Sequence, residues 1–406
     1  METRALLILT TLNLLDYLDR YLIAALGSLV KAELGLSDKA FGFLGTAFFL
    51  VYFLSSPVFG FLGDRFGRIH LMAVGATLWS LATSLTFWVT IYPTLVLARG
   101  LVGVGEASFG TLAPAYLADI LPLDRRARAL GIFYAAIPLG SALAYLAGGF
   151  IGSHFGWRPA FLLGGLPGLL LAVTISRLPA IHPLPPSAFN PPGGSRSSTW
   201  ALLRIPTLQR LTLGYGMITF ALGGLAFWMP RYLEVAKGLT LAQANYLLFG
   251  TVTVAGGLGT VAGGYFGDRL LRYTPRSPLW VSGLGVALAW PLAALTIYAA
   301  EPVYYLPALV GAVFLLFLNP GVITAVIVSV AGQARRARAV ALNIVLIHLV
   351  GDVPSPFLIG WVSDRWNLQL GVSLTLIALA LAALLIFSAF PHLTEDLNRA
   401  GETSGK

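Results

Sequence analysis

The sequence has 406 residues, of which 57% are hydrophobic and only 11% are charged, and its mean hydropathy is +0.80. Soluble domains carry about 25% charged residues, so we expect a membrane protein and not a water-soluble globule. The net charge of +9, from 26 basic and 17 acidic residues, then indicates membrane topology and not nucleic-acid binding. With no cysteine and five scattered histidines, the chain offers no disulfide and no metal-ligand spacing.

Twelve apolar stretches are long enough to cross a bilayer, which takes roughly 20 residues in a helix. A segment rich in Pro, Gly and Ser separates the first six stretches from the last six. We therefore expect an all-α integral membrane fold of twelve transmembrane helices in two six-helix bundles. The bundles cover 1–179 and 208–392, with a cytoplasmic linker at 180–207 and a cytoplasmic tail at 393–406. The expected spans are 5–30, 40–62, 70–90, 92–121, 129–152, 158–178, 208–231, 241–266, 279–300, 303–329, 339–361 and 369–390.

The basic residues predict the orientation, because Lys and Arg accumulate in cytoplasmic loops. Of the 26 basic residues, two lie inside spans and six lie on the side opposite the N terminus, so eighteen remain on the side of the N terminus. We therefore expect a multi-pass protein of the cell (inner) membrane with both termini in the cytoplasm. The eight residues of the two smaller groups are Arg20 and Arg99, then Lys31, Lys39, Arg158, Arg231, Lys237 and Arg365.

Two motifs occur once in each half of the chain. "GFLGDRFGR" at 60–68 returns as "GYFGDRLLR" at 264–272, and "RRARAL" at 125–130 returns as "RRARAV" at 335–340. Two six-helix units in the same orientation form a parallel repeat. This arrangement is typical of a secondary transporter whose binding site lies between the halves.

Five charged residues lie inside the first and fourth expected spans: Asp16, Asp19 and Arg20, and then Arg99 and Glu106. Arg99 and Glu106 are seven residues apart, so a helix presents them on nearly the same face. A charge at the bilayer centre costs about 2.5–3.5 kcal/mol. Pairing would offset most of this cost and leave one surplus negative charge. We expect a cavity-lining network that exchanges protons, since burial opposes the ionisation of a carboxylic acid and arginine favours it. The alternative is an ion-pair staple between the two spans.

The loop after the second span resembles the signature G-x-x-x-D-R-x-G-R of the major facilitator superfamily. Gly60, Asp64, Arg65, Gly67 and Arg68 match it, whereas Ile69 stands where the pattern usually has a second basic residue. The span-4 stretch "LARGLVGVGEASFG" also matches that superfamily's pattern R-x-x-x-G-x-G. The resemblance covers nearly the whole chain and implies the major facilitator fold.

We expect this loop to act as a cytoplasmic gate. Asp64 can cap a helix or pair with an arginine of the loop between spans 4 and 5, such as Arg128, and so hold the cytoplasmic side shut. The second copy, with Asp268 and Arg269, lacks the following glycine. The alternative is a solubilising turn whose charges set topology.

A narrower resemblance rests on "DYLDRYLIA" in span 1 together with "RGLVGVGEASFGTLAPAYLAD" in span 4. This combination is similar to the Spinster branch, whose eukaryotic members export sphingosine-1-phosphate or lysophospholipids. The resemblance implies that Asp19 and Glu106 are the protonatable residues of coupling, with Arg20 and Arg99 as their basic partners. Asp16 is expected to be a secondary partner.

Other polar and aromatic residues at membrane depth are candidates for a substrate cavity. They are Asn319, His348 and Asp352, with the aromatic residues Tyr215, Phe220 and Trp228 of span 7. His348 and Asp352 are one helical turn apart, and Pro354 and Pro356 are expected to bend their helix. These residues could contact a head group or carry a second proton, or they could serve packing alone.

The sequence thus predicts a proton-coupled secondary active transporter that works by alternating access, and the Spinster resemblance implies that its substrate is an amphipathic lysolipid or sphingoid phosphate. Drug efflux, or transport of an organic anion such as a sugar acid, is the alternative within transport. A polytopic membrane enzyme or sensor is a different class. It is disfavoured because no hydrolase motif, ATP-binding loop or additional soluble domain occurs. We expect a monomer in the lipid bilayer that needs no cofactor and uses the proton as its coupling ion.

Overall fold

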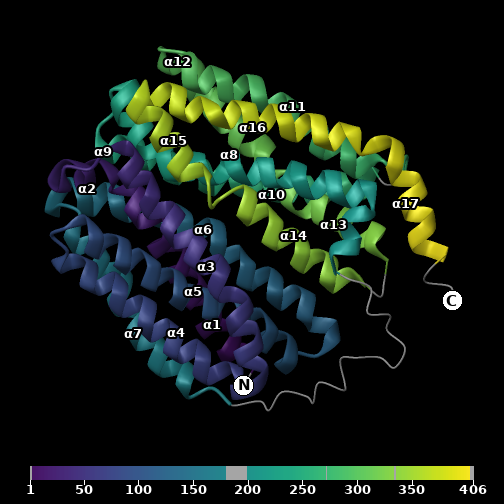
Figure 1. The fold of residues 1–406 in the computed structure, drawn as a ribbon, viewed down its shortest axis with the longest axis horizontal. Helices are drawn as coiled ribbons and strands as arrows, with labels where there is room; N and C mark the ends of the chain where they lie inside the picture. Colours follow the sequence, from purple (N-terminus) through teal and green to yellow (C-terminus); the bar gives the residue numbers. More distant parts are fainter. Residues whose placement is uncertain (1, 180–198, 271, 333–334, 403–406) are drawn as a thin grey trace. The chain divides into compact units, whose positions relative to one another are not determined.

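The structure, a computed structural model, describes residues 2–179, 199–270, 272–332 and 335–402 (Figure 1). Within these ranges the regular secondary structure is entirely helical. Eleven helical segments of the described chain are long and apolar enough to cross a membrane. The first helix, α1 (Glu2–Ala25), has a similar length but carries the buried charges of Asp16, Asp19 and Arg20.

The chain divides by its internal contacts into two compact units. Unit 1 comprises residues 1–186 and 226–250, and unit 2 comprises residues 187–225 and 251–406. Of the predicted linker, residues 180–198 lie outside the described part of the chain. The predicted bundle boundaries remain predictions.

Unit 1 is built from seven helices of the first half and, from the second half, the end of one long helix and a short helix that follows it. Its α1 packs along α6, and α5 packs against both α3 and α4. The elements after α1 are α2 (Gly27–Leu34), α3 (Asp38–Phe66), α4 (Arg68–Leu85), the 3-10 turn η1 (Thr86–Trp88), α5 (Tyr92–Ile120), α6 (Leu123–Phe155), α7 (Arg158–Ser176), the last part of α8 (Pro206–Lys237) and α9 (Leu241–Thr251).

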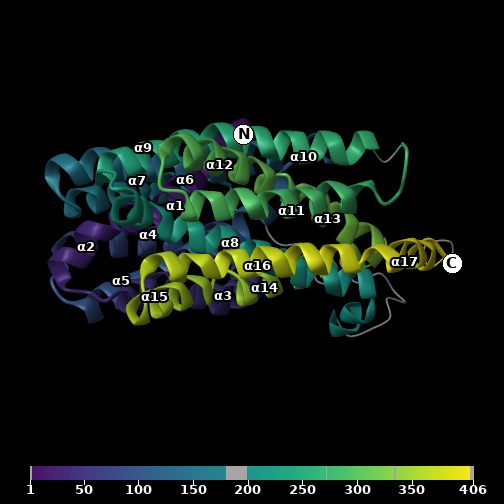
Figure 2. The same ribbon diagram turned by 90° about the horizontal axis from the view of Figure 1, so that it is seen from above.

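Unit 2 continues with shorter helices, several of them interrupted inside one expected span. In both views α16 runs beside α11, and α17 follows it at the yellow end of the chain (Figures 1 and 2). The elements are η3 (Thr199–Arg204), the first part of α8, the π-helical turn η4 (Val252–Gly256), α10 (Gly257–Leu270), α11 (Ser277–Tyr298), α12 (Pro302–Phe317), α13 (Asn319–Ala331), α14 (Arg336–Val350), α15 (Ser355–Arg365), α16 (Leu368–Ser388) and α17 (Phe390–Glu402).

Helix packing repeats between the units in the order that the duplicated motifs predict. In unit 1, α3 packs on α5, and α4 packs on both α5 and α7. In unit 2, α10 packs on α12, and α11 packs on both α12 and α16. Because corresponding segments make corresponding contacts, the two halves share one internal arrangement, as expected for a parallel repeat.

Two helix boundaries show how local sequence sets the elements. The first predicted span, 5–30, is divided between two helices: α1 ends at Ala25, and α2 begins at Gly27 after a break at Leu26. The expected bend of the eleventh span is confirmed, since α14 ends at Val350 and α15 begins only at Ser355. Proline lacks an N–H and clashes with the preceding turn, so Pro354 and Pro356 interrupt the helix there.

Candidate functional site

Glycines of α5 bring this helix close to two neighbours. A Cβ atom added to Gly103 would lie 2.7 Å from the carbonyl oxygen of Phe48 in α3. A Cβ atom on Gly105 would lie 2.6 Å from the carbonyl oxygen of Gly75 in α4. Only glycine permits such backbone approach. The glycines of the pattern R-x-x-x-G-x-G therefore let α5 pack closely between α3 and α4. This packing positions the two charged residues of α5, Arg99 and Glu106.

Helix α1 is held against α6 in the same way. A Cβ atom on Gly140 of α6 would lie 2.4 Å from the carbonyl oxygen of Leu14. The side-chain amide of Asn13 donates a hydrogen bond of 2.8 Å to the carbonyl oxygen of Phe133. This contact fixes the rotation of α1 and therefore the direction in which its charged residues point.

Arg20 is the centre of a buried charge network between α1 and α5. Its Nε and Nη2 atoms donate to Oε2 of Glu106 at 3.1 and 2.9 Å, and Nη2 also donates to Oδ1 of Asp16 at 3.1 Å. Arg20 is 8% exposed, while Asp16 and Glu106 are 1% and 0% exposed. Asp16, predicted as a secondary partner, thus contacts Arg20 directly.

Asp19 points from α1 toward α4. Its Oδ2 atom accepts a hydrogen bond from the hydroxyl of Thr83, and its Oδ1 atom has no hydrogen-bond partner among the described residues. A Cβ atom on Gly164 of α7 would lie 3.8 Å from this Oδ1 atom. Asp19 is fully buried, and Gly164 thus lies directly beside its carboxylate.

Arg99 of α5 completes the network. Its Nη2 atom donates to the carbonyl oxygen of Arg20 at 3.4 Å, and its guanidinium lies 4.8 Å from the ring centre of Phe48. Arg99 also interacts electrostatically with Asp19 and Glu106. Its Nε and Nη1 atoms have no hydrogen-bond partner within the described ranges. A buried guanidinium with spare donors is suited to an anionic group.

Aromatic residues that the sequence did not single out surround Arg20. Its guanidinium lies 4.2 Å from the ring centre of Tyr17, 5.2 Å from that of Phe48 and 5.1 Å from that of Tyr52. Such cation–π contacts stabilise a desolvated arginine. Neither these rings nor Thr83 stands out in the sequence, because aromatic and threonine residues are common in membrane helices.

The Major Facilitator Superfamily profile matches residues 9–351. Protein spinster homolog 1 of Xenopus tropicalis is 34% identical over 382 residues, which cover 88% of this chain and 72% of the relative. The sphingosine-1-phosphate transporter SPNS2 of Danio rerio is 33% identical over 383 residues, covering 87% and 74%.

Solved structures show the same fold. A bacterial homologue of the human lysosomal transporter Spinster, in an inward-facing and occupied conformation, superposes with a TM-score of 0.84. The match has 21% sequence identity and covers 97% of this chain and 98% of that chain. The predicted all-helical major facilitator fold is thereby confirmed.

This chain belongs to the Spinster family. It is therefore a transporter of the Major Facilitator Superfamily and not an enzyme. The two charged segments that carried the resemblance, in α1 and α5, are the segments that form the buried network of this Spinster transporter.

Unit 2 of the Spinster transporter holds a second polar pair. Nδ1 of His348 lies 2.5 Å from Oδ2 of Asp352, and Asp352 is 7% exposed. A Cβ atom on Gly223 of α8 would lie 2.1 Å from Oδ1 of Asp352, so the carboxylate sits directly against α8. Tyr215, one of the predicted cavity residues, interacts electrostatically with Asp352.

The other predicted cavity residues do not join this pair. Asn319 is fully buried at the break between α12 and α13, where its amide donates to the carbonyl oxygens of Leu315 and Leu316 at 3.2 and 3.0 Å. These bonds satisfy the end of a helix and give Asn319 a structural part. Phe220 is buried in unit 2, whereas Trp228 belongs to unit 1, with its ring centre 5.5 Å from that of Phe41.

The predicted cytoplasmic gate forms the turn between α3 and α4. Gly67 has φ = +88°, a conformation that favours glycine, and it separates Phe66 of α3 from Arg68 of α4. Gly60 lies about two turns before Gly67 in α3. Arg65 is exposed, and its guanidinium lies 5.3 Å from the ring centre of Phe66.

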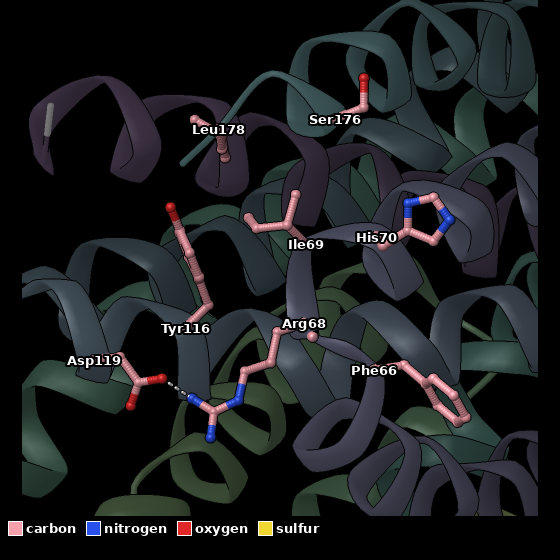
Figure 3. A pocket seen from close by; sticks show the side chains of 9 residues that line it. Phe66, Arg68, Ile69, His70, Tyr116, Asp119, Ser176 and Leu178 are labelled. Atoms are coloured by element: carbon pink, nitrogen blue, oxygen red, sulfur yellow. Dashed lines mark hydrogen bonds and ion pairs between the residues drawn. The ribbon is translucent and has the colours of Figure 1, made fainter. Parts of the chain in front are cut away.

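Figure 3 shows Arg68 reaching Asp119 at the end of α5, with which it forms an ion pair. The pair lines a pocket of about 190 Å³ that also contains His70, Tyr116 and Ser176. The side chains of Asp64, Arg128 and Asp268 lie outside the described part of the structure. Arg269 is exposed and hydrogen-bonds Tyr265 of the same helix. The role of this turn as a cytoplasmic gate therefore remains a prediction.

Proposed function

We propose that this Spinster transporter is proton-coupled, works by alternating access and moves an amphipathic lysolipid or sphingoid phosphate. The observation that carries the proposal is the buried network of unit 1, in which three carboxylates accompany two guanidiniums. With all five groups ionised the network has one negative charge in excess. One bound proton neutralises it, and unpaired charge at membrane depth is costly.

The geometry supports a competition between proton and substrate for arginine. Arg20 is held by Oε2 of Glu106, whose Oε1 atom has no hydrogen-bond partner among the described residues. Protonation of Glu106 weakens its hold on Arg20, because a neutral acid is a poorer acceptor than a carboxylate. Arg20 and Arg99 are then free to bind an anionic group, and its release returns Arg20 to Glu106. Asp19 is the second protonatable carboxylate.

The substrate class is supported by three features. Two donor nitrogens of Arg99 have no hydrogen-bond partner in the described part of the chain, and such donors suit a phosphate. The rings of Tyr17, Phe48 and Tyr52 form an aromatic surface beside Arg20. One relative with 33% identity is named a sphingosine-1-phosphate transporter. The pair of His348 and Asp352 offers a second polar contact in unit 2.

The remaining expectations complete the proposal. The protein acts as a monomer in the cell (inner) membrane, with both termini in the cytoplasm and with the proton as its coupling ion and no cofactor. The α3–α4 turn, together with Arg128 and the second-half copy at Asp268 and Arg269, acts as the cytoplasmic gate.

The test is transport by the purified protein in proteoliposomes. Radiolabelled sphingosine-1-phosphate and lysophosphatidylcholine are offered with and without an imposed pH gradient, and glucuronate and ethidium serve as an organic anion and a cationic drug. We expect accumulation of a phosphate-bearing lipid above equilibrium only with the gradient, accompanied by substrate-dependent proton movement. Accumulation of glucuronate or ethidium alone would contradict the substrate class.

Two variants test the coupling. Glu106→Gln and Asp19→Asn remove a titratable group with little change of shape, so we expect each to lose uphill accumulation while still exchanging labelled for unlabelled substrate. The matched control is Glu33→Gln, which removes a carboxylate outside the network. Gradient-driven accumulation by both network variants would show that these carboxylates do not couple the proton.

A further inference from the structure

Two chain segments about 200 residues apart meet through polar side chains at one end of unit 1. Ser28, Lys31 and Asp38 come from α2 and the start of α3, and Arg231 and Glu234 come from the end of α8. All five residues belong to unit 1 by its internal contacts. In the sequence, Lys31 and Arg231 served only as basic residues counted to predict the orientation in the membrane.

Asp38 joins the two basic residues. It forms an ion pair with Lys31, and its Oδ1 atom lies 3.3 Å from Nε of Arg231. The side chains of Lys31, Asp38 and Arg231 are 8%, 14% and 22% exposed. Ser28 donates a hydrogen bond of 3.0 Å to Oε1 of Glu234, and Nη1 of Arg231 donates to the Ser28 hydroxyl at 3.4 Å.

The cluster is electrically neutral, with two cations and two anions. Arg231 and Glu234 come from one segment, and Lys31 and Asp38 come from the other. Separation of the segments would break the ion pair of Asp38 with Arg231 and both hydrogen bonds of Ser28. Water would have to replace these contacts, so the cluster stabilises the arrangement in which the segments touch.

An aromatic layer lies next to the polar cluster. Phe41 of α3 has its ring centre 4.9 Å from that of Phe227 and 5.5 Å from that of Trp228 in α8. Phe41 and Trp228 are fully buried and Phe227 is 4% exposed. Deeper still, the amide of Asn245 in α9 donates to the carbonyl oxygen of Ala25 at 3.0 Å. Polar and apolar contacts together join α2 and α3 to the end of α8 and to α9 at this end of the unit.

The helix connections place the cluster on a definite side of the membrane. Helices α1 and α8 both approach it with their C-terminal ends, and α3 begins there and ends at the Gly67 turn. The cluster therefore lies on the side opposite the α3–α4 turn. Its two segments come from the two halves of the chain that alternating access must separate.

We propose that this polar cluster and the aromatic layer form the gate on the side opposite the α3–α4 turn. This inference rests on the alternating access of the proposed function. Arg231 and Asp38 are positioning residues of transport: they hold the gate shut in the arrangement described, and their contacts break once in each cycle to admit or release substrate.

The experiment uses a reporter in a chain that has no natural cysteine. Asn245→Cys places a thiol at a fully buried position near the start of α9. The purified protein in lipid nanodiscs is treated with a membrane-impermeant maleimide, which reaches both faces, and the labelling rate is measured without substrate. Adding Arg231→Gln or Asp38→Asn is expected to raise this rate about fivefold.

Two controls separate a gate from general loosening. Arg231→Lys keeps the charge and should keep labelling slow. Arg158→Gln breaks the ion pair of Arg158 with Glu33, which joins α2 to α7 on the same side of unit 1 without involving α8, and it should leave the rate unchanged. An unchanged labelling rate in Arg231→Gln, or an equal rise of the labelling rate in Arg158→Gln, would contradict the proposed gate. Because no substrate is used, a failure of the proposed lipid transport would be recognised separately.

Discussion

Arg20 shows how one residue can stabilise several others at membrane depth. It holds Glu106 through two donors and Asp16 through one, and it lies against three aromatic rings. Lysine, with one ammonium on a flexible stem, cannot reproduce this planar set of donors. The pairing between α1 and α5 therefore depends on arginine at this position.

Removing Arg20 should destabilise the protein strongly. Arg20→Ala leaves Asp16 and Glu106 buried without the guanidinium that hydrogen-bonds both of them, which is expected to cost about 3–5 kcal/mol. Adding Glu106→Gln should restore part of this loss, because one unpaired charge disappears. Thermal unfolding of the single and double variants in detergent measures the effect. Additive losses would show that Arg20 and Glu106 do not stabilise each other.

A second residue-scale prediction concerns Glu33, which lies in α2 outside the membrane-spanning helices. The hydrogen bond from Arg158 holds the pKa of Glu33 below its usual value, and a second bond from Trp157 acts in the same direction. The folded state thus favours the charged carboxylate. The resulting stability is complete above the ordinary glutamate pKa and is lost as the pH falls through the lowered one.

The comparison of the parent with Glu33→Gln tests this dependence. The parent should unfold at a higher temperature at neutral pH, and the difference should shrink as the pH is lowered below about 4.5. Since the Glu33 side chain is 47% exposed, the effect should stay below about 1 kcal/mol. A difference that is independent of pH would mean that the charge of Glu33 does not contribute.

At the scale of secondary structure, α5 positions the network because its glycines allow close packing on both sides. Gly103 touches the backbone of α3 and Gly105 touches the backbone of α4. Arg99 and Glu106 of the same helix reach α1. A change in the distance between α4 and α5 would therefore move the charged groups as well as the helices.

Gly105→Ala should separate α4 from α5. Its added methyl group would lie 2.7 Å from Cβ of Trp79 and 2.6 Å from a carbonyl oxygen, so overpacking should cost about 1–3 kcal/mol. The matched control is Gly131→Ala in α6, where the new Cβ has no neighbour within 4 Å and helix propensity favours alanine. The unfolding temperature should fall in the first variant and should stay equal or rise in the second. Equal behaviour of both would exclude tight packing at Gly105.

At the scale of the whole molecule, the uneven distribution of basic residues predicts orientation. With the predicted spans, eighteen of the 26 Lys and Arg residues fall on the side of the N terminus. Positive charge is retained in the cytoplasm during insertion, so this side should be cytoplasmic. The prediction concerns the direction in which the transporter faces and is independent of its substrate.

Cysteine labelling can test the orientation on the cysteine-free chain. Glu301→Cys lies between α11 and α12, and Tyr273→Cys lies between α10 and α11, and both positions are exposed. A membrane-impermeant maleimide added to intact cells should label the first and not the second. After permeabilisation both should react. The reverse pattern would place the N terminus outside.

Hydropathy and charge patterns were sufficient for the helical fold, the repeat and the charged residues of α1 and α5, because these properties depend on local sequence. Asp19, Arg20, Arg99 and Glu106 are recognisable since ionised groups are rare in apolar helices. Thr83 and the contact of Phe41 with Trp228 were not predictable, because common side chains become informative only when helices bring them together.

The amino-acid order alone determined that this chain crosses a membrane many times, is built from two related halves and carries ionisable groups at depth. The packed helices decided that Glu106 and Asp16 share one arginine, that Asp19 turns to Thr83 instead, and that the end of α8 meets α2 and α3. The reason is physical: burial and charge are properties of single residues, whereas pairing depends on which helix faces approach one another.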